Sequence, residues 1–157
     1  MRRYLVVANQ TLQAAEVREV LRERIIAGPC SFFVIVPDTK AAQYDSVAAG
    51  GTLPQPGMWW WATYYARPAT DEEATAQARQ RLSSMLAGFA ALGVPVEGEL
   101  GDADPLEAIE KVCAGRQFDE IIVATLPRPV SRWLRAGLPR RVQRRFGLPV
   151  TTIVASY

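Results

Sequence analysis

Short, unbroken apolar runs alternate along this chain with longer amphipathic stretches, and this alternation constrains the fold more than any other feature. Continuous apolar runs are typical of strands buried on both faces of a sheet, whereas apolar residues that recur every three or four positions indicate helices. Strands that alternate with helices form a parallel sheet with helices on both faces, an α/β fold. The predicted strands are residues 4–8, 32–36, 94–100, 120–124 and 150–154.

Helix boundary signals support the same alternation. Thr70 and Glu73 form a capping box that opens a long helix, and Asp104 with Pro105 is a second helix start. Four helices are predicted: one over residues 12–27, one from residue 70 to Gly93, one from Asp104 and one from Pro139. Gly28-Pro29 ends the first helix, and Val142 and Phe146 lie on the buried face of the last.

Ligands of open parallel sheets bind beyond the carboxyl ends of the strands, at the point where the strand order reverses. The segments to examine are therefore those that follow Ala8, Val36, Leu100 and Ala124. Asp38 also lies at this edge, but a Pro-Asp-Thr sequence after a strand is ordinary turn chemistry.

A length of 157 residues suits one domain, residues 1–157, with one core. Residues 40–69 form an irregular, aromatic-rich insertion that holds Trp59, Trp60 and Trp61. We expect it to be a lid over the ligand site, a contact with another subunit, or a flap on its own domain. The chain has no apolar run long enough to span a membrane and no signal peptide, so we expect a cytoplasmic protein.

The chain has no histidine, which excludes Ser-His-Asp and Cys-His catalysis and the commonest zinc sites. Cys30 and Cys113 are interpreted as two buried thiols, with a redox pair as the alternative. Asp102 and Asp104 could bind a metal, but Asp104 is explained as a helix cap. We therefore predict no catalytic residues and no metal site.

The net charge of +2 hides a strong asymmetry. Residues 97–120 hold eight acidic groups, and residues 126–146 hold seven arginines and no acid. Such a run can bind nucleic-acid phosphates. However, the four arginines between residues 140 and 145 fit the exposed face of the last helix, and only Trp133 is available for base stacking. We expect no nucleic-acid partner and no membrane partner.

Several short motifs resemble the universal stress protein family: Gly101-Asp102, the run of residues 118–123 and the closing residues 147–150. The resemblance covers nearly the whole chain except residues 40–69. It implies a single-domain, three-layer α/β/α sandwich with a five-stranded parallel sheet of order 3-2-1-4-5. It also implies ATP or AMP bound between the first and fourth strands, a role in the stress response, and a homodimer formed through the last strand.

ATP-binding members of that family carry an acid after the first strand and the motif G-x2-G-x9-G-[S/T] after the fourth. This chain keeps the spacing of the motif but changes most of its residues. Asn9 stands at the acid, Ala124 and Pro127 at the first two glycines, Gly137 at the third, and Leu138 at the hydroxyl position. The third glycine is thus the one position of the motif that matches.

Pro127 has no N–H and Leu138 has no hydroxyl, so two hydrogen bonds to phosphate are lost. Hydrogen bonds to charged groups contribute about 1.5–3 kcal/mol each. The two losses together weaken binding by roughly 100-fold to 10,000-fold. We therefore predict that family-type ATP binding is lost or weak, with ATP or AMP as the only cofactor that the resemblance suggests.

Three arginines, Arg128, Arg132 and Arg135, stand in the altered loop, where guanidinium groups suit phosphate and carboxylate oxygens. Either they bind an anionic ligand, or they form a solvated loop that pairs with the acidic residues 97–120. The candidate nucleotide- or anion-binding residues are Asn9, Val36, Ala124, Thr125, Arg128, Arg132, Gly137 and Leu138.

These observations favour a non-enzymatic binding or regulatory protein that takes an acidic or phosphate-bearing ligand. One alternative is an ATP- or AMP-binding protein with weak nucleotide hydrolase activity. Another is a homodimeric interaction module that associates through the last strand or through the aromatic insertion.

Overall fold

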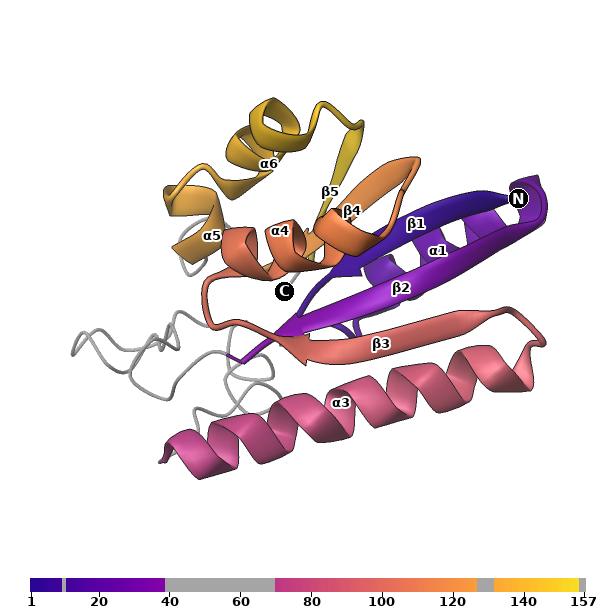
Figure 1. The fold of residues 1–157 in the computed structure, drawn as a ribbon. Coiled ribbons are helices and arrows are strands. Elements are labelled where there is room, and N and C mark those ends of the chain that lie inside the picture. Colours follow the sequence, from indigo (N-terminus) through magenta and orange to yellow (C-terminus); the bar gives the residue numbers. More distant parts are fainter. Residues whose placement is uncertain (10, 39–69, 127–131, 156–157) are drawn as a thin grey trace, which may run out of the picture.

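The structure is a computed structural model, and it describes residues 1–9, 11–38, 70–126 and 132–155. The aromatic insertion at 40–69, Pro127 and Arg128 lie outside the described residues. The described chain contains five strands, β1 (Arg2–Val7), β2 (Cys30–Pro37), β3 (Val96–Gly101), β4 (Glu120–Thr125) and β5 (Val150–Val154), and five helices, α1 (Ala15–Ala27), α3 (Asp71–Ala91), α4 (Pro105–Gly115), α5 (Arg132–Arg135) and α6 (Leu138–Phe146) (Figure 1).

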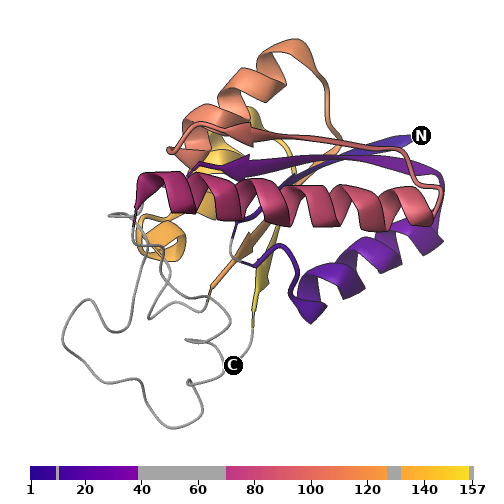
Figure 2. The ribbon, with the colours of Figure 1, turned by 90° about the horizontal axis from the view of Figure 1, so that it is seen from below.

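The five strands form one sheet of order β3-β2-β1-β4-β5, and every neighbouring pair is parallel. This order confirms the expected 3-2-1-4-5 sheet. Helices α1 and α3 pack on one face of the sheet, and α4 and α6 pack on the other, which gives three layers (Figure 2). No helix among the described residues has the length and apolar character needed to cross a membrane.

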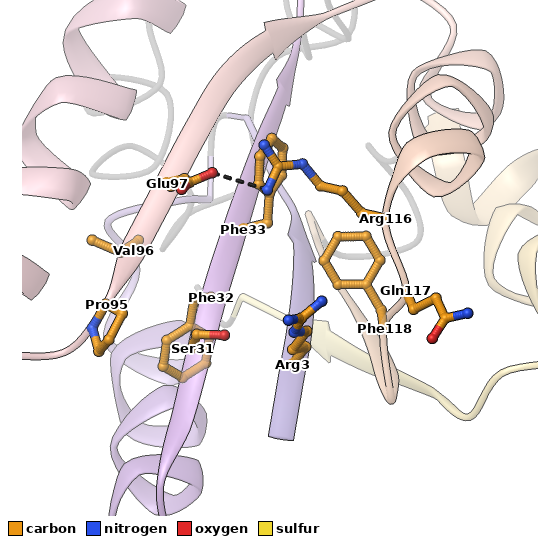
Figure 3. A pocket seen from close by; sticks show the side chains of 10 residues that line it. All are labelled: Arg3, Ser31, Phe32, Phe33, Pro95, Val96, Glu97, Arg116, Gln117 and Phe118. Carbon is orange, nitrogen blue, oxygen red and sulfur yellow. Dashed lines mark ion pairs between the residues drawn. The ribbon is translucent and has the colours of Figure 1, made fainter. Parts of the chain in front are cut away.

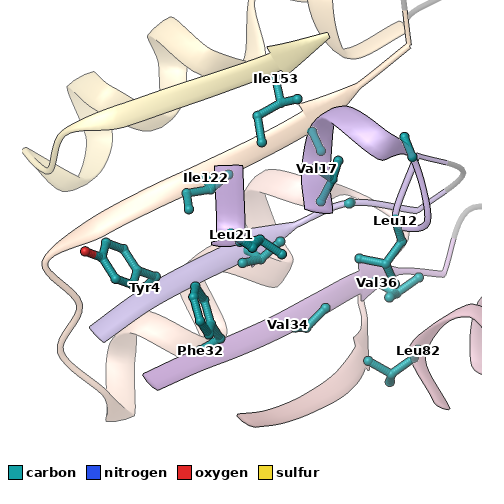
Figure 4. Packing of buried hydrophobic residues seen from close by; sticks show 14 of the residues in the cluster. Tyr4, Leu12, Val17, Leu21, Phe32, Val34, Val36, Leu82, Ile122 and Ile153 are labelled. Atoms are coloured by element: carbon teal, nitrogen blue, oxygen red, sulfur yellow. The ribbon is translucent and has the colours of Figure 1, made fainter. Parts of the chain in front are cut away.

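Side chains of each central strand alternate between the two faces. Tyr4 and Val6 point towards α1 and α3, in the cluster drawn in Figure 4, whereas Leu5 and Val7 point towards α4 and α6. All four residues are buried. The continuous apolar run of β1 therefore has the predicted cause, which is burial on both faces of the sheet.

Two of the predicted helix starts are confirmed by their capping hydrogen bonds, and a third differs from the structure by one residue. Thr70 accepts a hydrogen bond from the Glu73 N–H at 3.1 Å, and Asp104 accepts one from the Leu106 N–H at 2.9 Å, so both predicted caps are confirmed. The last helix begins at Leu138, one residue before the predicted Pro139.

The first helix begins at Ala15 rather than at residue 12. Residues 11–13 form a turn instead, because the Leu12 N–H bonds the Asn9 carbonyl and the Ala14 N–H bonds the Thr11 carbonyl. The third strand begins at Val96 rather than at residue 94, since the Val94 N–H still bonds a carbonyl at the end of α3.

Candidate functional site

The strand order reverses between β1 and β4. The chain passes from β1 to β2 on one side and from β4 to β5 on the other, so these two neighbouring strands send their connections in opposite directions. Because open parallel sheets bind ligands beyond the carboxyl ends of the strands at such a reversal, the candidate site lies at the ends of β1 and β4.

Three polar side chains are buried in the described part of the chain, Asn9, Thr11 and Thr125, and all of them lie at this reversal. The Thr11 hydroxyl donates to the Ala124 carbonyl oxygen at 3.0 Å, which joins the end of β1 to the end of β4. The Thr125 hydroxyl donates to the Leu126 carbonyl oxygen at 3.3 Å. Buried polar groups are costly unless they are hydrogen-bonded, and these bonds satisfy the two hydroxyl groups and fix the ends of the strands.

Asn9 stands where the sequence resemblance places the acid of the universal stress proteins. Both polar atoms of its side-chain amide form hydrogen bonds within the protein. Its Nδ2 donates to the Pro37 carbonyl oxygen at 2.9 Å, at the end of β2. Its Oδ1 accepts from Nη1 of Arg81 at 2.8 Å. Asn9 is only 5% exposed and Arg81 is partly buried, and the three residues connect the ends of β1 and β2 to α3. A carboxylate at position 9 could not donate to Pro37, and the asparagine is therefore specific to this arrangement.

Sequence reasoning missed Arg81. It lies on α3 between Ala78 and Leu82, both of which are buried against the sheet. An arginine beside the apolar stripe of a helix is a detectable signal, because such a charge needs a polar partner on the neighbouring element. Here that partner is Asn9, and the sequence alone does not reveal that Asn9 lies next to α3.

Asp38 joins a third element to the same edge. The Thr75 hydroxyl donates to Oδ1 of Asp38 at 2.7 Å, and the Asp38 N–H donates to the Gly101 carbonyl oxygen at 3.0 Å. Asp38 thus links the end of β2 to α3 and to the end of β3. This is more than the turn chemistry predicted from sequence.

Two of the predicted site residues are core residues of the sheet. Val36 is fully buried and Ala124 is 1% exposed, and both pack in the cluster beneath α1 and α3. Ala124 still contributes its carbonyl oxygen to the reversal point through Thr11. Asn9 follows β1, and Ala124 and Thr125 end β4, so the three residues lie at the carboxyl ends of two neighbouring strands.

The last two positions of the phosphate motif, Gly137 and Leu138, lie at the start of α6. Gly137 adopts a left-handed conformation with φ of 68° and precedes α6 without a side-chain cap. Leu138, which stands at the family's hydroxyl position, is 2% exposed and packs with Val142 in the core on the α4 and α6 face. Arg132 lies in α5, and its side chain, like Arg128, is outside what the structure describes. The short helix α5 was not predicted.

The acidic residues after β3 stabilise local structure. Oδ2 of Asp102 accepts from Nζ of Lys111 at 2.8 Å, and this hydrogen bond lowers the pKa of the Asp102 carboxyl. Asp104 caps α4. Within the described ranges, no group of three acidic, histidine or cysteine side chains is placed to hold a metal ion.

The two cysteines lie on opposite sides of the sheet. Cys30 is buried in the cluster beneath α1 and α3, whereas Cys113 packs against the other cluster from α4 and is only half-buried. The prediction of two buried thiols is therefore correct for Cys30, whereas Cys113 in α4 is only partly buried. Because the sheet separates them, they do not form a redox pair. Burial raises the pKa of both thiols, which disfavours the reactive thiolate.

The arginines of α6 are arranged as predicted, on the exposed face of a helix whose other face holds Val142 and Phe146. Arg145 forms an ion pair with Glu110, so the arginine-rich and acidic stretches do meet at one point. Among the described residues, Arg140 and Arg144 form no ion pair.

No protein-family model and no curated protein matches the sequence. Solved structures do match its fold. A universal stress protein from Archaeoglobus fulgidus superposes with a TM-score of 0.57 at 16% identity, covering 98% of this chain and 93% of the other. A universal stress protein family protein from Arabidopsis thaliana, solved with AMP bound, superposes with a TM-score of 0.58 at 12% identity, covering 99% and 93%. At these identities the likeness concerns the fold, and this chain has the fold of the universal stress proteins.

Proposed function

We propose that this chain is a non-enzymatic, ligand-binding regulatory protein. It binds a small anionic ligand at the carboxyl ends of β1 and β4 and does not bind ATP with the affinity of ATP-binding universal stress proteins. The observation that carries the proposal is the state of Asn9. Its amide is held between Pro37 and Arg81, where the family has a carboxylate.

The positions that would hold the phosphates support the same proposal. Leu138 is buried in the core, so a hydroxyl is replaced by a side chain that the fold needs for packing. Pro127 offers no N–H. The arginines at 128 and 132 supply donors of another kind, because a guanidinium group can bind two oxygens of a phosphate or carboxylate at once.

Calorimetry with inorganic pyrophosphate as a minimal anionic probe tests this proposal. We expect binding that weakens by roughly tenfold or more in Arg128→Gln, since a hydrogen bond to a charged group contributes about 1.5–3 kcal/mol. Arg140→Gln is the matched control, because Arg140 is exposed on α6 outside the candidate loop. Equal weakening in both variants, or no binding of pyrophosphate or other anions by the wild type, would refute the assignment of the loop.

A second candidate function is AMP or ATP binding with weak hydrolysis, and the AMP-bound neighbour of the same fold favours it. ATP hydrolysis by the purified protein that is abolished in Arg128→Ala would support this alternative over a non-enzymatic role. Hydrolysis that persists in the variant would indicate a contaminating enzyme.

We also propose that two copies associate through β5. This strand is at the edge of the sheet, and Val154 on it is 43% exposed. A monomer at micromolar concentrations in analytical ultracentrifugation would exclude the dimer. A contact through the aromatic insertion is the alternative, and loss of the dimer in a variant with Trp60→Ala but not with Val154→Lys would favour it. The free thiols of Cys30 and Cys113 support a cytoplasmic location.

A further inference from the structure

A groove of about 700 Å³ opens at the amino ends of the strands, at the edge opposite the candidate ligand site. It lies between the C-terminal ends of α4 and α6 and the start of β1, on the α4 and α6 face of the sheet. A smaller hollow of about 210 Å³ extends towards β2 and β3, and it shares Arg3, Arg116, Gln117 and Phe118 with the larger groove (Figure 3). We call the two together the arginine groove.

The groove has an apolar floor. Phe118, Phe146 and Leu148 are half-buried and pack against the core cluster on this face. Met1 lines the groove and is 78% exposed. In the smaller hollow, the guanidinium carbon of Arg116 lies 4.4 Å from the centre of the Phe33 ring, a cation–π contact.

The rim of the groove is rich in arginine. Three arginines line it, Arg3, Arg116 and Arg145, against two carboxylates, Asp119 and Glu97. The Asp119 carboxylate is used by the fold, because Oδ2 accepts the backbone N–H of Arg3 at 2.8 Å. Within the described part of the chain, the Arg3 guanidinium forms no ion pair. Figure 3 shows the Arg3 and Arg116 side chains near the ring of Phe118.

The existing ion pairs of the rim are easily exchanged. Arg116 pairs with Glu97 at 2.9 Å, and their side chains are 49% and 67% exposed. Arg145 pairs with Glu110, and their side chains are 57% and 50% exposed. Exposed pairs of this kind contribute little to stability, so a carboxylate from another molecule can replace the internal partner at small cost.

We propose that the arginine groove is a docking surface for an acidic segment of a partner protein that carries a large apolar side chain. Arginine, methionine and aromatic residues are enriched at protein interfaces, and arginine and aromatic residues dominate their binding energy. The guanidinium groups suit the carboxylates of such a segment, and the half-buried floor suits its apolar side chain. This surface is separate from the proposed ligand site, so either can fail alone.

Fluorescence anisotropy with a labelled 12-residue peptide of glutamate and phenylalanine tests the proposal, with the same peptide carrying lysine in place of glutamate as the probe control. We expect the acidic peptide to bind more tightly than the basic one. Arg3→Gln and Arg145→Gln should each weaken binding about 2-fold to 5-fold, and together about 10-fold. Arg144→Gln is the matched control, because it removes an exposed arginine of the same helix that does not line the groove.

Amide chemical-shift mapping in the presence of the acidic peptide should place the largest shifts at residues 116–119 and 146–148. Three outcomes would overturn the proposal: equal binding of the acidic and basic peptides, an equal loss in the Arg144→Gln control, or shifts confined to the opposite edge of the sheet. Tighter binding of a single-stranded oligonucleotide in the groove, or a dimer that Arg3→Gln dissociates, would also overturn it by assigning the surface to another occupant.

Discussion

Replacing Arg24 with methionine should destabilise the fold, because it removes a two-point contact that ties α1 to the sheet. Nε of Arg24 donates to Oε2 of Glu120 at 3.1 Å, and Nη2 donates to Oε1 at 3.0 Å. The Thr151 hydroxyl also donates to Glu120, so α1, β4 and β5 meet at one carboxylate. The side chains of Arg24 and Glu120 are only 25% and 13% exposed, which limits screening by water.

Removing one partner leaves the other partly desolvated without its counter-charge. Hydrogen bonds to charged groups contribute about 1.5–3 kcal/mol, so we expect Arg24→Met to lower the free energy of unfolding by about 1.5–3 kcal/mol. In a double-mutant cycle with Glu120→Gln, the interaction energy should be about 1–2 kcal/mol. Urea unfolding at pH 7 measures all four species. Lys111→Met, which removes the exposed partner of Asp102, is the control and should cost less.

The same pair gives a pH dependence. Burial raises the pKa of the Glu120 carboxyl, but hydrogen bonds from Arg24 and Thr151 outweigh burial and hold the pKa below the ordinary value of 4.5. A carboxyl whose pKa is lower in the folded state contributes stability above the unfolded pKa and loses it as the pH falls through the folded pKa. The stability difference between wild type and Glu120→Gln should therefore shrink below pH 4.5. An interaction energy near zero at pH 7, or a difference that does not change with pH, would refute the reasoning.

Two further substitutions test the packing and capping of α4. Gly101→Ala should lower the free energy of unfolding by about 1–3 kcal/mol, because a Cβ at Gly101 would lie 2.7 Å from both Ala108 Cβ and Ile35 Cγ2. Gly115→Ala, at a site with nothing within 4 Å of the new Cβ, is its control and should be neutral or stabilising in the same urea titration. Asp104→Ala should lower the free energy of unfolding by about 1 kcal/mol, because it removes the cap of α4. An unchanged midpoint of thermal unfolding would contradict the capping role of Asp104.

The sheet could be predicted from sequence because its central strands are buried on both faces. Ile121, Ile122 and Val123 are fully buried, and their side chains alternate between the two core clusters. No polar residue therefore interrupts the apolar run that predicts the strand. The strand order came from the resemblance, and the structure confirms it. Strand and helix ends were less predictable, because they depend on backbone hydrogen bonds such as Leu12 N–H to the Asn9 carbonyl, which leave little trace in residue type.

The candidate site was predictable only in part, and the reason is tertiary contact. The predicted strand ends put Asn9 and Thr125 at the same edge of the sheet, since carboxyl ends of parallel strands meet at one edge, and the structure has both residues at that edge. The partner of Asn9, Arg81, is 72 residues away in the sequence and comes from another layer of the fold. Likewise, the loss of a hydroxyl at Leu138 could be read from sequence, but its burial in the core could not.

The central proposal is that this chain does not bind ATP with the affinity of ATP-binding universal stress proteins, and calorimetric titration of the purified protein with ATP tests it most directly. Pro127 has no N–H and Leu138 has no hydroxyl to donate to a phosphate, and the amide of Asn9 is engaged by Pro37 and Arg81. Starting from a micromolar site, the predicted dissociation constant is about 0.1–10 mM. A dissociation constant in the micromolar range, at a 1:1 ratio of ATP to chain, would contradict the account.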